Sequence, residues 1–462
     1  NNTVSNNTAI GSQALTANTT GTQNTAVGGN ALDANTTGGN NSALGKDALG
    51  ANTTGDFNTA LGKDALRDNT TADNNTAVGH DALQANTTGI NNVAVGSRAL
   101  DAITTSNNHV AVGFNSLSAN TSGEKNTAVG SGTLAINTEG EKNVAIGYVA
   151  LEANTTGDNN TAVGHNALAD NTTGGFNTAV GYNSLDTNTT GHSNVAMGTS
   201  ALQANTTAAE NTAIGSSCMA YNTTGTANTA LGRNALRENT TASSNTAIGF
   251  EALKENTTGF QNTVVGSNAG DAITTGGNCT AVGMSALSSN TTANDNTAVG
   301  YNALFSNTTA GHNTAVGRGA LFANTTGSQL VALGSRALES NTTASNNVAI
   351  GYSAVRETTT GTNNVGIGVD ALQQNTTGNN NTAVGALALD SCTTGSSNTS
   401  IGRSNMSGNS DGSNNVAIGT FCMDTGSGMN YNVAVGHDTA RSVTTGGNNV
   451  MLGHAAGHSN SP

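Results

Sequence analysis

The chain has 462 residues, of which 60 are glycine, one is proline and none is tryptophan, and charged residues make up only 9%. A chain this poor in large apolar side chains cannot fill a wide globular core, so it either stays disordered or buries small side chains in a thin, repetitive core. The formal net charge of −14 argues against nucleic acid as a partner, because phosphate binding needs clustered Lys and Arg. No run of 18 apolar residues occurs, so the sequence predicts no membrane insertion.

Glycine recurs every 17 residues from Gly11 to Gly453, which gives 27 copies without an insertion or a deletion. We number the repeat so that this glycine is position 5, and each copy, or coil, begins at position 1, the first at Asn7. Residues 75–91, NTAVGHDALQANTTGIN, show the consensus. A disordered tract has no reason to keep phase, whereas in a solenoid an extra residue would shift every later side chain out of register. The sequence therefore predicts an all-β fold, a parallel β-solenoid or β-roll of 27 coils.

Each coil contains three segments with a structural preference. Positions 2–4, Thr/Val-Ala-Val/Ile, alternate in a way that predicts a short strand, and Ala-Leu at positions 8–9 predicts a second one. Asn-Thr-Thr-Gly at positions 12–15 has turn chemistry, with left-handed backbone expected at Asn and Gly. Position 9 is Leu in 20 copies, so we expect it to form the core with position 4 facing it. Positions 3 and 5, nearly always Ala and always Gly, would then lie on the opposite face.

The Ala and Gly columns have two interpretations. They could mark a close backbone approach inside one narrow coil, or a packing surface where several chains meet. We favour the packing surface, because a lone thin rod with 3% aromatic residues is weakly stabilised. At position 12, Asn occurs in 21 copies and predicts a hydrogen-bonded amide ladder, an interpretation we prefer to N-glycosylation of the Asn-Thr-Thr triplets.

The last coils depart from the consensus, since position 9 becomes Met406, Met423, Ala440 and Gly457. We therefore divide the chain into a regular solenoid shaft, residues 1–402, and degenerate C-terminal coils of the same solenoid, residues 403–462.

The run Asn-Thr-Ala-Val-Gly-x-x-Ala-Leu, repeated from Asn7 onward, resembles the head repeats of trimeric autotransporter adhesins and, more closely, the shaft repeats of bacteriophage tail fibres. The resemblance covers all the coils. It implies a parallel homotrimer with an adhesive role, located outside the cell on a virion fibre or a cell surface. One feature differs, because the coils of those adhesins are usually shorter than 17 residues.

No motif in the sequence predicts an enzyme or a cofactor site. A nucleophile elbow and a phosphate-binding loop are both missing from the sequence. Cys218 and Cys422 share position 8 but lie twelve coils apart, and Cys279 and Cys392 occupy other positions, so we expect no intrachain disulfide.

Histidines give one candidate metal site. His437 and His454 occupy position 6 of successive coils and His458 follows nearby, so stacked imidazoles about 5 Å apart could take an ion. Solvent-facing polar residues are the simpler explanation, and we therefore assign no metal and keep the pair as a candidate.

Position 6 is the one variable column with a bias, because 15 of its 27 residues are basic, aromatic or histidine and none is acidic. An aromatic and basic column suits carbohydrate or an anionic surface. A groove between neighbouring chains that accepts a large side chain would explain the same bias. The surface-binding candidates are Lys46, Lys63, Phe114, Tyr148, Tyr182, Arg233, Phe250, Tyr301, Arg318, Tyr352 and Arg403.

These observations together predict a structural or adhesive extracellular fibre shaft without catalysis. Its expected partners are other copies of itself, side by side or end to end, and a cell-surface glycan or other surface receptor. Two alternatives stay open, a self-assembling extracellular filament subunit and an ice-binding β-solenoid. Ice binding is disfavoured because the Thr residues at positions 13 and 14 are adjacent, so only one of them can face outward in a strand.

Overall fold

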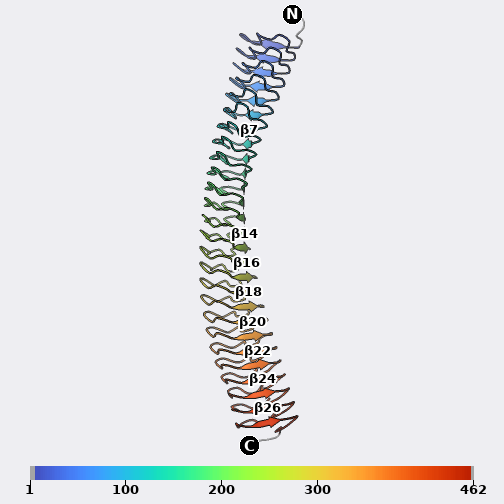
Figure 1. The fold of residues 1–462 in the computed structure, drawn as a ribbon, viewed down its shortest axis with the longest axis vertical. Helices are drawn as coiled ribbons and strands as arrows, with labels where there is room; N and C mark the ends of the chain where they lie inside the picture. The colour runs from blue at the N-terminus through green and yellow to red at the C-terminus, as the bar shows by residue number, and fades with distance from the viewer. Residues whose placement is uncertain (1–5, 459–462) are drawn as a thin grey trace. The chain divides into compact units, whose positions relative to one another are not determined.

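The computed structural model describes residues 6–458 and divides the chain into two compact units, unit 1 (residues 1–228) and unit 2 (residues 229–462). Each unit is a parallel β-solenoid in which every 17-residue coil contributes one three-residue strand (Figure 1). No helix occurs between residues 6 and 458. The ends of the predicted shaft and of the degenerate coils, residues 1–5 and 459–462, lie outside the described residues.

The strands occupy positions 2–4 of successive coils. Unit 1 contains β1 Thr8–Ile10, β2 Thr25–Val27, β3 Ser42–Leu44, β4 Thr59–Leu61, β5 Thr76–Val78, β6 Val93–Val95, β7 Val110–Val112, β8 Thr127–Val129, β9 Val144–Ile146, β10 Thr161–Val163, β11 Thr178–Val180, β12 Val195–Met197 and β13 Thr212–Ile214. Unit 2 contains β14 Thr229–Leu231, β15 Thr246–Ile248, β16 Thr263–Val265, β17 Thr280–Val282, β18 Thr297–Val299, β19 Thr314–Val316, β20 Val331–Leu333, β21 Val348–Ile350, β22 Val365–Ile367, β23 Thr382–Val384, β24 Thr399–Ile401, β25 Val416–Ile418, β26 Val433–Val435 and β27 Val450–Leu452.

Within each unit every strand pairs in parallel with the next, and the register is one coil. In unit 1, for example, Ala26 lies opposite Ala43. The backbone N–H of Thr25 donates to the carbonyl of Asn41 at 2.8 Å, and that of Gly45 donates to the carbonyl of Val27 at 2.9 Å. The predicted β-solenoid with a 17-residue period is therefore confirmed.

The core faces the other way from the prediction. Position 3, not position 4, lies inside the coil: Ala26 is fully buried together with Ala31 and Leu32 of positions 8 and 9, whereas Leu44 at position 4 is 49% exposed. Alternation shows that positions 2 and 4 oppose position 3, but it cannot show which side is inside. A 17-residue coil encloses room for one Leu and two Ala, and Val or Ile at position 3 would overfill it.

The packing surface between chains that we predicted at positions 3 and 5 is also wrong. The Ala column is buried within a single chain, and the Gly column marks the close backbone approach that was the alternative. A Cβ atom added to Gly45 would lie 2.3 Å from the carbonyl oxygen of Gly62 in the next coil. Position 5 therefore accepts only glycine, whose φ here is +144°.

The second predicted strand is absent because the backbone is left-handed directly before it and at its second residue. Positions 7, 9 and 17 have positive φ, with 57° at Asp47, 52° at Leu32 and 59° at Asn40. Positions 8–9 therefore lie in a series of turns, and the left-handed residues are not the Asn and Gly of positions 12 and 15 where we expected them. Left-handed backbone at Leu costs roughly 1–2 kcal/mol, which full burial of the side chain offsets.

The predicted amide ladder at position 12 is confirmed. The Nδ2 atom of Asn52 donates to Oδ1 of Asn35 at 2.8 Å and to the carbonyl of Gly55 at 3.1 Å. The Asn at position 1 adds a second buried amide, because Nδ2 of Asn41 donates to the same Gly55 carbonyl at 2.8 Å. All three asparagines are fully buried, so these amides hold the turn together.

Three interruptions of the ladder leave an amide oxygen of the preceding coil without a donor. Cys392 replaces Asn at position 12, and the Oδ1 atom of Asn375 in the preceding coil is left buried without a hydrogen-bond donor in the described part of the chain. A buried carbonyl oxygen without a donor costs roughly 1–3 kcal/mol. The same holds for Asn256, which precedes Ile273, and for Asn341, which precedes Thr358.

In one coil of unit 2 the core substitutions compensate one another in volume. Where Leu is replaced by Gly270 at position 9, Val264 replaces Ala at position 3 and Ile273 replaces Asn at position 12, and all three are buried or nearly so. A Cβ atom on Gly270 would lie 3.0 Å from Cδ1 of Ile273 and 3.4 Å from Cγ2 of Val264. In the last described coil the space above Gly457 is occupied in the same way by Met451.

Replacing Cys392 with Asn should stabilise unit 2. The new amide would donate to Oδ1 of Asn375 and accept from Nδ2 of Asn409, which restores two ladder bonds and adds about 1–2 kcal/mol to the free energy of unfolding. The measurement is the denaturant midpoint by circular dichroism. The control is Cys422→Ala, which restores the consensus residue at position 8 without touching the ladder. A C392N midpoint equal to or below that of C422A would contradict the ladder's contribution.

Candidate functional site

The position 6 side chains leave the coil at a turn, directly after the strand and its invariant glycine. All eleven surface-binding candidates predicted from the sequence are exposed, for example Tyr148 at 57% and Phe114 at 55%. The left-handed residue at position 7 turns the chain back at once, so the position 6 side chain projects from the coil instead of packing against it. This column therefore lies at the surface of the coil, while its role in binding stays a prediction.

In unit 1 the column forms an aromatic ladder over three successive coils. The rings of Tyr148 and His165 have centroids 5.2 Å apart, and those of His165 and Tyr182 are 5.4 Å apart, with interplanar angles of 33° and 34°. The result is a continuous strip of ring faces and edges, one ring per coil.

In unit 2 the same column pairs cations with rings. The guanidinium of Arg233 lies 5.9 Å from the centroid of Phe250, and that of Arg403 lies 5.9 Å from the centroid of Phe421, which occupies position 7 of the next coil. By contrast, the two position 6 lysines of unit 1 are paired with the acidic residue that follows them. Lys46 forms an ion pair with Asp47, and Lys63 forms one with Asp64.

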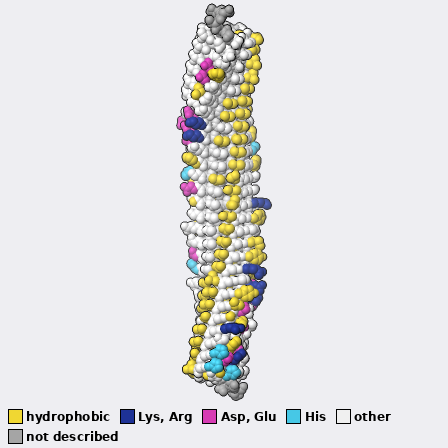
Figure 2. All heavy atoms as spheres, turned by 90° about the vertical axis from the view of Figure 1, so that its right-hand side faces the viewer, with side chains coloured by type: hydrophobic (Ala, Val, Ile, Leu, Met, Phe, Trp, Pro, Cys, Tyr) yellow, Lys and Arg dark blue, Asp and Glu magenta, His cyan; other side chains and the backbone are white. Residues whose placement is uncertain are grey.

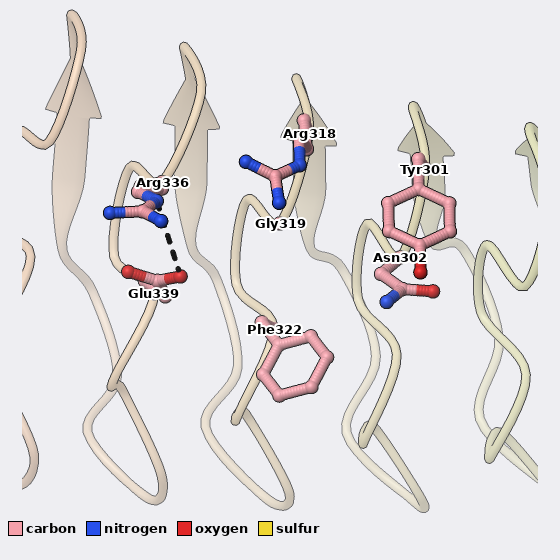
Figure 3. A pocket seen from close by; sticks show the side chains of 7 residues that line it. All are labelled: Tyr301, Asn302, Arg318, Gly319, Phe322, Arg336 and Glu339. Carbon is pink, nitrogen blue, oxygen red and sulfur yellow. Dashed lines mark ion pairs between the residues drawn. The ribbon is translucent and has the colours of Figure 1, made fainter.

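A pocket of about 120 Å³ opens beside position 6 in unit 2 (Figure 3). Three successive coils line it, and Figure 3 shows the lining side chains standing on neighbouring coils, Tyr301 and Arg318 just beyond their strands and Phe322 on the next leg of the coil. Gly319 creates the space, because position 7 usually carries a side chain and a Cβ atom here would meet nothing closer than 3.8 Å. The lining residues are Tyr301, Asn302, Arg318, Gly319, Phe322, Arg336 and Glu339.

Of the arginines around this pocket, some form ion pairs and one does not. Nε of Arg336 lies 3.7 Å from Oε1 of Glu339, as the dashed line in Figure 3 marks, and the other oxygen of Glu339 accepts from Nε of Arg356 at 3.0 Å. Arg318 has no carboxylate within ion-pair distance among the described residues. The pocket therefore offers one guanidinium without an ion-pair partner, beside the aromatic rings of Tyr301 and Phe322. The chain as a whole is acidic.

Sequence reasoning missed the contribution of position 10. Phe305 and Phe322 occupy it in successive coils and stack at 5.3 Å with an interplanar angle of 10°, and Glu339 follows in the next coil. Two phenylalanines at the same position of neighbouring copies were a visible signal in a chain with only eight.

A second exposed column consists of the aliphatic side chains at position 4. Because position 3 faces inward, this column faces outward in both units, beside the Thr or Val of position 2. Figure 2 shows hydrophobic side chains aligned in columns along the face drawn. The most exposed position 4 residues are Ile10, Leu44, Leu61, Ile146, Met197, Leu231, Val316, Ile367, Ile401, Ile418 and Leu452.

The histidine pair predicted from the sequence is brought together, with a different third partner. The rings of His437 and His454 stack at 5.5 Å, and Asp438, not His458, completes a group whose ligand atoms lie within 4.8 Å of one another.

Burial shifts the pKa of the cysteine thiols. It raises the pKa of Cys218 and Cys392 to about 12 and that of Cys279 and Cys422 to about 11, so these thiols are protonated at neutral pH. All four cysteines are buried as thiols, in agreement with the prediction that they form no intrachain disulfide.

No protein-family model matches the chain, and no curated protein matches it either. The described residues contain no helix long and apolar enough to cross a membrane.

His109 is the one buried histidine in the described chain, in place of the Asn at position 1. Its Nδ1 atom accepts from the backbone N–H of Asn126 at 3.3 Å, and desolvation lowers the pKa of its imidazole from 6.5 to about 4. The imidazole is therefore neutral in the folded chain at neutral pH.

Replacing His109 with Asn should reduce the acid sensitivity of unit 1. Between pH 6.5 and pH 4 this imidazole binds a proton in the unfolded chain but stays neutral in the folded chain. The free energy of unfolding therefore falls as the pH falls through this window. The loss amounts to about 3 kcal/mol at most, and H109N lacks it. Denaturant unfolding of both proteins at pH 7 and pH 4 measures the difference. An identical pH dependence in the two proteins would contradict this assignment.

Proposed function

We propose that the chain is the shaft of an adhesive extracellular fibre, of the kind found in bacteriophage tail fibres or bacterial surface adhesins, and that it has no catalytic role. The observation that carries the proposal is the exposed aliphatic column at position 4. An apolar column along a whole unit marks an interaction surface. A compact partner would cover only a few coils, whereas another copy of this chain presents the same column with the same period and can cover all of them. The resemblance to trimeric fibres favours three copies.

Polar substitutions in this column should weaken assembly. Replacing Leu44, Leu61 and Ile146 with Thr, the residue that position 2 carries on the same face, removes roughly 1 kcal/mol of apolar burial for each side chain in each copy. Light scattering coupled to size exclusion gives the mass. We expect a multimeric wild type and a triple variant that dissociates at higher concentrations.

The control is Ile90→Thr, an exposed aliphatic residue at position 16 that lies outside the column. It should assemble like the wild type. A wild-type chain that is monomeric at micromolar concentration would overturn the proposal.

Attachment to a surface is assigned to position 6 and to the pocket around Gly319. Aromatic faces bind the apolar faces of sugar rings, and a guanidinium binds carboxylate or sulfate groups in two-pronged geometry. Tyr301, Phe322 and the uncommitted Arg318 combine both features, which supports an acidic cell-surface glycan as the receptor.

Gly319→Asn should close the pocket without disturbing the coil, because Asn302 adopts the same left-handed backbone at position 7 with a φ of 55°. We expect at least about a tenfold loss of affinity for acidic glycans, since two anchor contacts are blocked. Binding to a panel of acidic and neutral glycans by surface plasmon resonance measures it. Ser200→Asn places the same side chain at position 7 of a coil outside the pocket and should bind like the wild type. Unchanged binding by G319N would remove the pocket from the receptor site.

The ice-binding alternative has less support. The Oγ1 atom of Thr53 at position 13 donates to the carbonyl of Thr70 at 3.0 Å, and most other position 13 threonines repeat this bond along the units. Within the Thr-Thr pair only the position 14 hydroxyl is left exposed, so this pair does not form the flat double array that orders water. A filament grown end to end is distinguished from a side-by-side fibre by its length in electron micrographs.

A further inference from the structure

The cluster around His437 has the geometry of a small chelate at the surface of unit 2. His437 and His454 follow β26 and β27 at position 6, and their rings are parallel within 3° at 5.5 Å. Nδ1 of His437 lies 3.0 Å from Oδ2 of Asp438. Figure 2 shows histidine side chains gathered with basic and acidic ones near the lower end of the view.

We propose that His437, His454 and Asp438 bind one transition-metal ion of the Zn²⁺ class. Two imidazoles and one carboxylate are ligands for Zn²⁺, Ni²⁺ or Cu²⁺, whereas Ca²⁺ and Mg²⁺ prefer all-oxygen sites. Ligands about 2.0–2.2 Å from zinc lie roughly 3–3.5 Å from one another. The His437–Asp438 pair already has this spacing, and the exposed His454 ring reaches it by a side-chain rotation. Water completes the coordination.

The neighbouring residues orient the carboxylate. Nη1 of Arg441 donates to Oδ1 of Asp438 at 3.0 Å, which leaves Oδ2 facing His437. Arg441 also lies 3.7 Å from Oδ2 of Asp424 and 4.7 Å from the centroid of Phe421. The two carboxylates outweigh the one guanidinium, so the net charge of the cluster favours a cation when the imidazoles are neutral.

The position of the cluster suggests what the ion does. It joins the last two described coils, in which position 9 is Ala440 and Gly457 instead of Leu and in which the strand residues Val450 and Leu452 are largely exposed. A ligand that binds only the folded state stabilises it. The ion would act as a clamp between these coils.

A second cluster in unit 1 provides an internal comparison. His80 and Asp81 repeat the same pair, with Nδ1 and Oδ2 2.9 Å apart, and Asp64 lies within reach. This cluster has a single imidazole, and Lys63 already pairs with Asp64. It should bind the same ion much more weakly, which makes it a matched control.

The test is calorimetric titration of ZnCl₂ into the full chain, purified without a histidine tag. We expect one strong site per chain, weakened at least about tenfold by His437→Asn or His454→Asn and less by Asp438→Asn, and unchanged by His80→Asn. All four side chains are on the surface, so the variants should fold. Zn²⁺ should also slow proteolysis of the last coils in the wild type and not in H437N/H454N.

Two results would overturn the proposal. One is the absence of a saturable strong site in the wild type. The other is a strong site that survives in H437N/H454N or disappears in H80N, because either would place the ion elsewhere. Neither result bears on assembly through position 4 or on glycan binding.

Discussion

Stacking of each coil on the next at an interval of 17 residues is the constraint on which the structure of each unit depends. The strand hydrogen bonds, the amide ladder of position 12 and the close contact between position 5 glycines all join fixed positions of neighbouring coils. An inserted residue would break all of these columns at once. A substitution, by contrast, is felt only by its neighbours, as the single unpaired oxygen of Asn375 beside Cys392 illustrates. This asymmetry accounts for a chain that varies in its side chains and never in its spacing.

Inside one coil, core substitutions compensate one another. Val264, Gly270 and Ile273 depart from the consensus together, because the space that this coil encloses has to be filled. Outside the coil no such condition applies, and positions 6, 7 and 10 vary from copy to copy. The features proposed to carry function, the position 4 column, the pocket and the histidine cluster, all lie on this outer surface.

The features that depend on the 17-residue period could be predicted from the sequence. The features that depend on which way a side chain or a turn points could not. The phase of the glycines predicted the solenoid, and the recurrence of Asn at position 12 predicted the ladder of which Asn35 and Asn52 are part. Alternation at positions 2–4 predicted the strand but left its inner face undecided, so Ala26 and Leu44 were assigned to the wrong sides. Left-handed backbone at Leu32 was also beyond prediction, because isolated Leu disfavours it and only the packing of the finished coil selects it.

The candidate site was predictable to a similar degree. Position 6 was recognised by its composition, because a bias toward basic and aromatic residues in one column is visible without knowledge of the fold. The contribution of Phe322 and Glu339 was not recognised. The left-handed residues at positions 7 and 9 bring position 10 beside position 6, and these turns cannot be predicted from the residue types at those positions. In such a chain a site is formed where two columns of side chains meet in space.

The left-handed backbone at position 7 lets the outer surface of a coil change without a change in the fold of that coil. Because the coil already holds this residue in a conformation that Gly, Asn and Asp accept readily, losing a side chain there, as at Gly319, hollows the surface while the coil keeps its path. Gaining one fills the hollow again. A single substitution at position 7 therefore reshapes the outer surface of one coil and leaves the 17-residue stacking unchanged. Length and surface shape are then independent of each other, because the first changes by whole coils and the second by single residues.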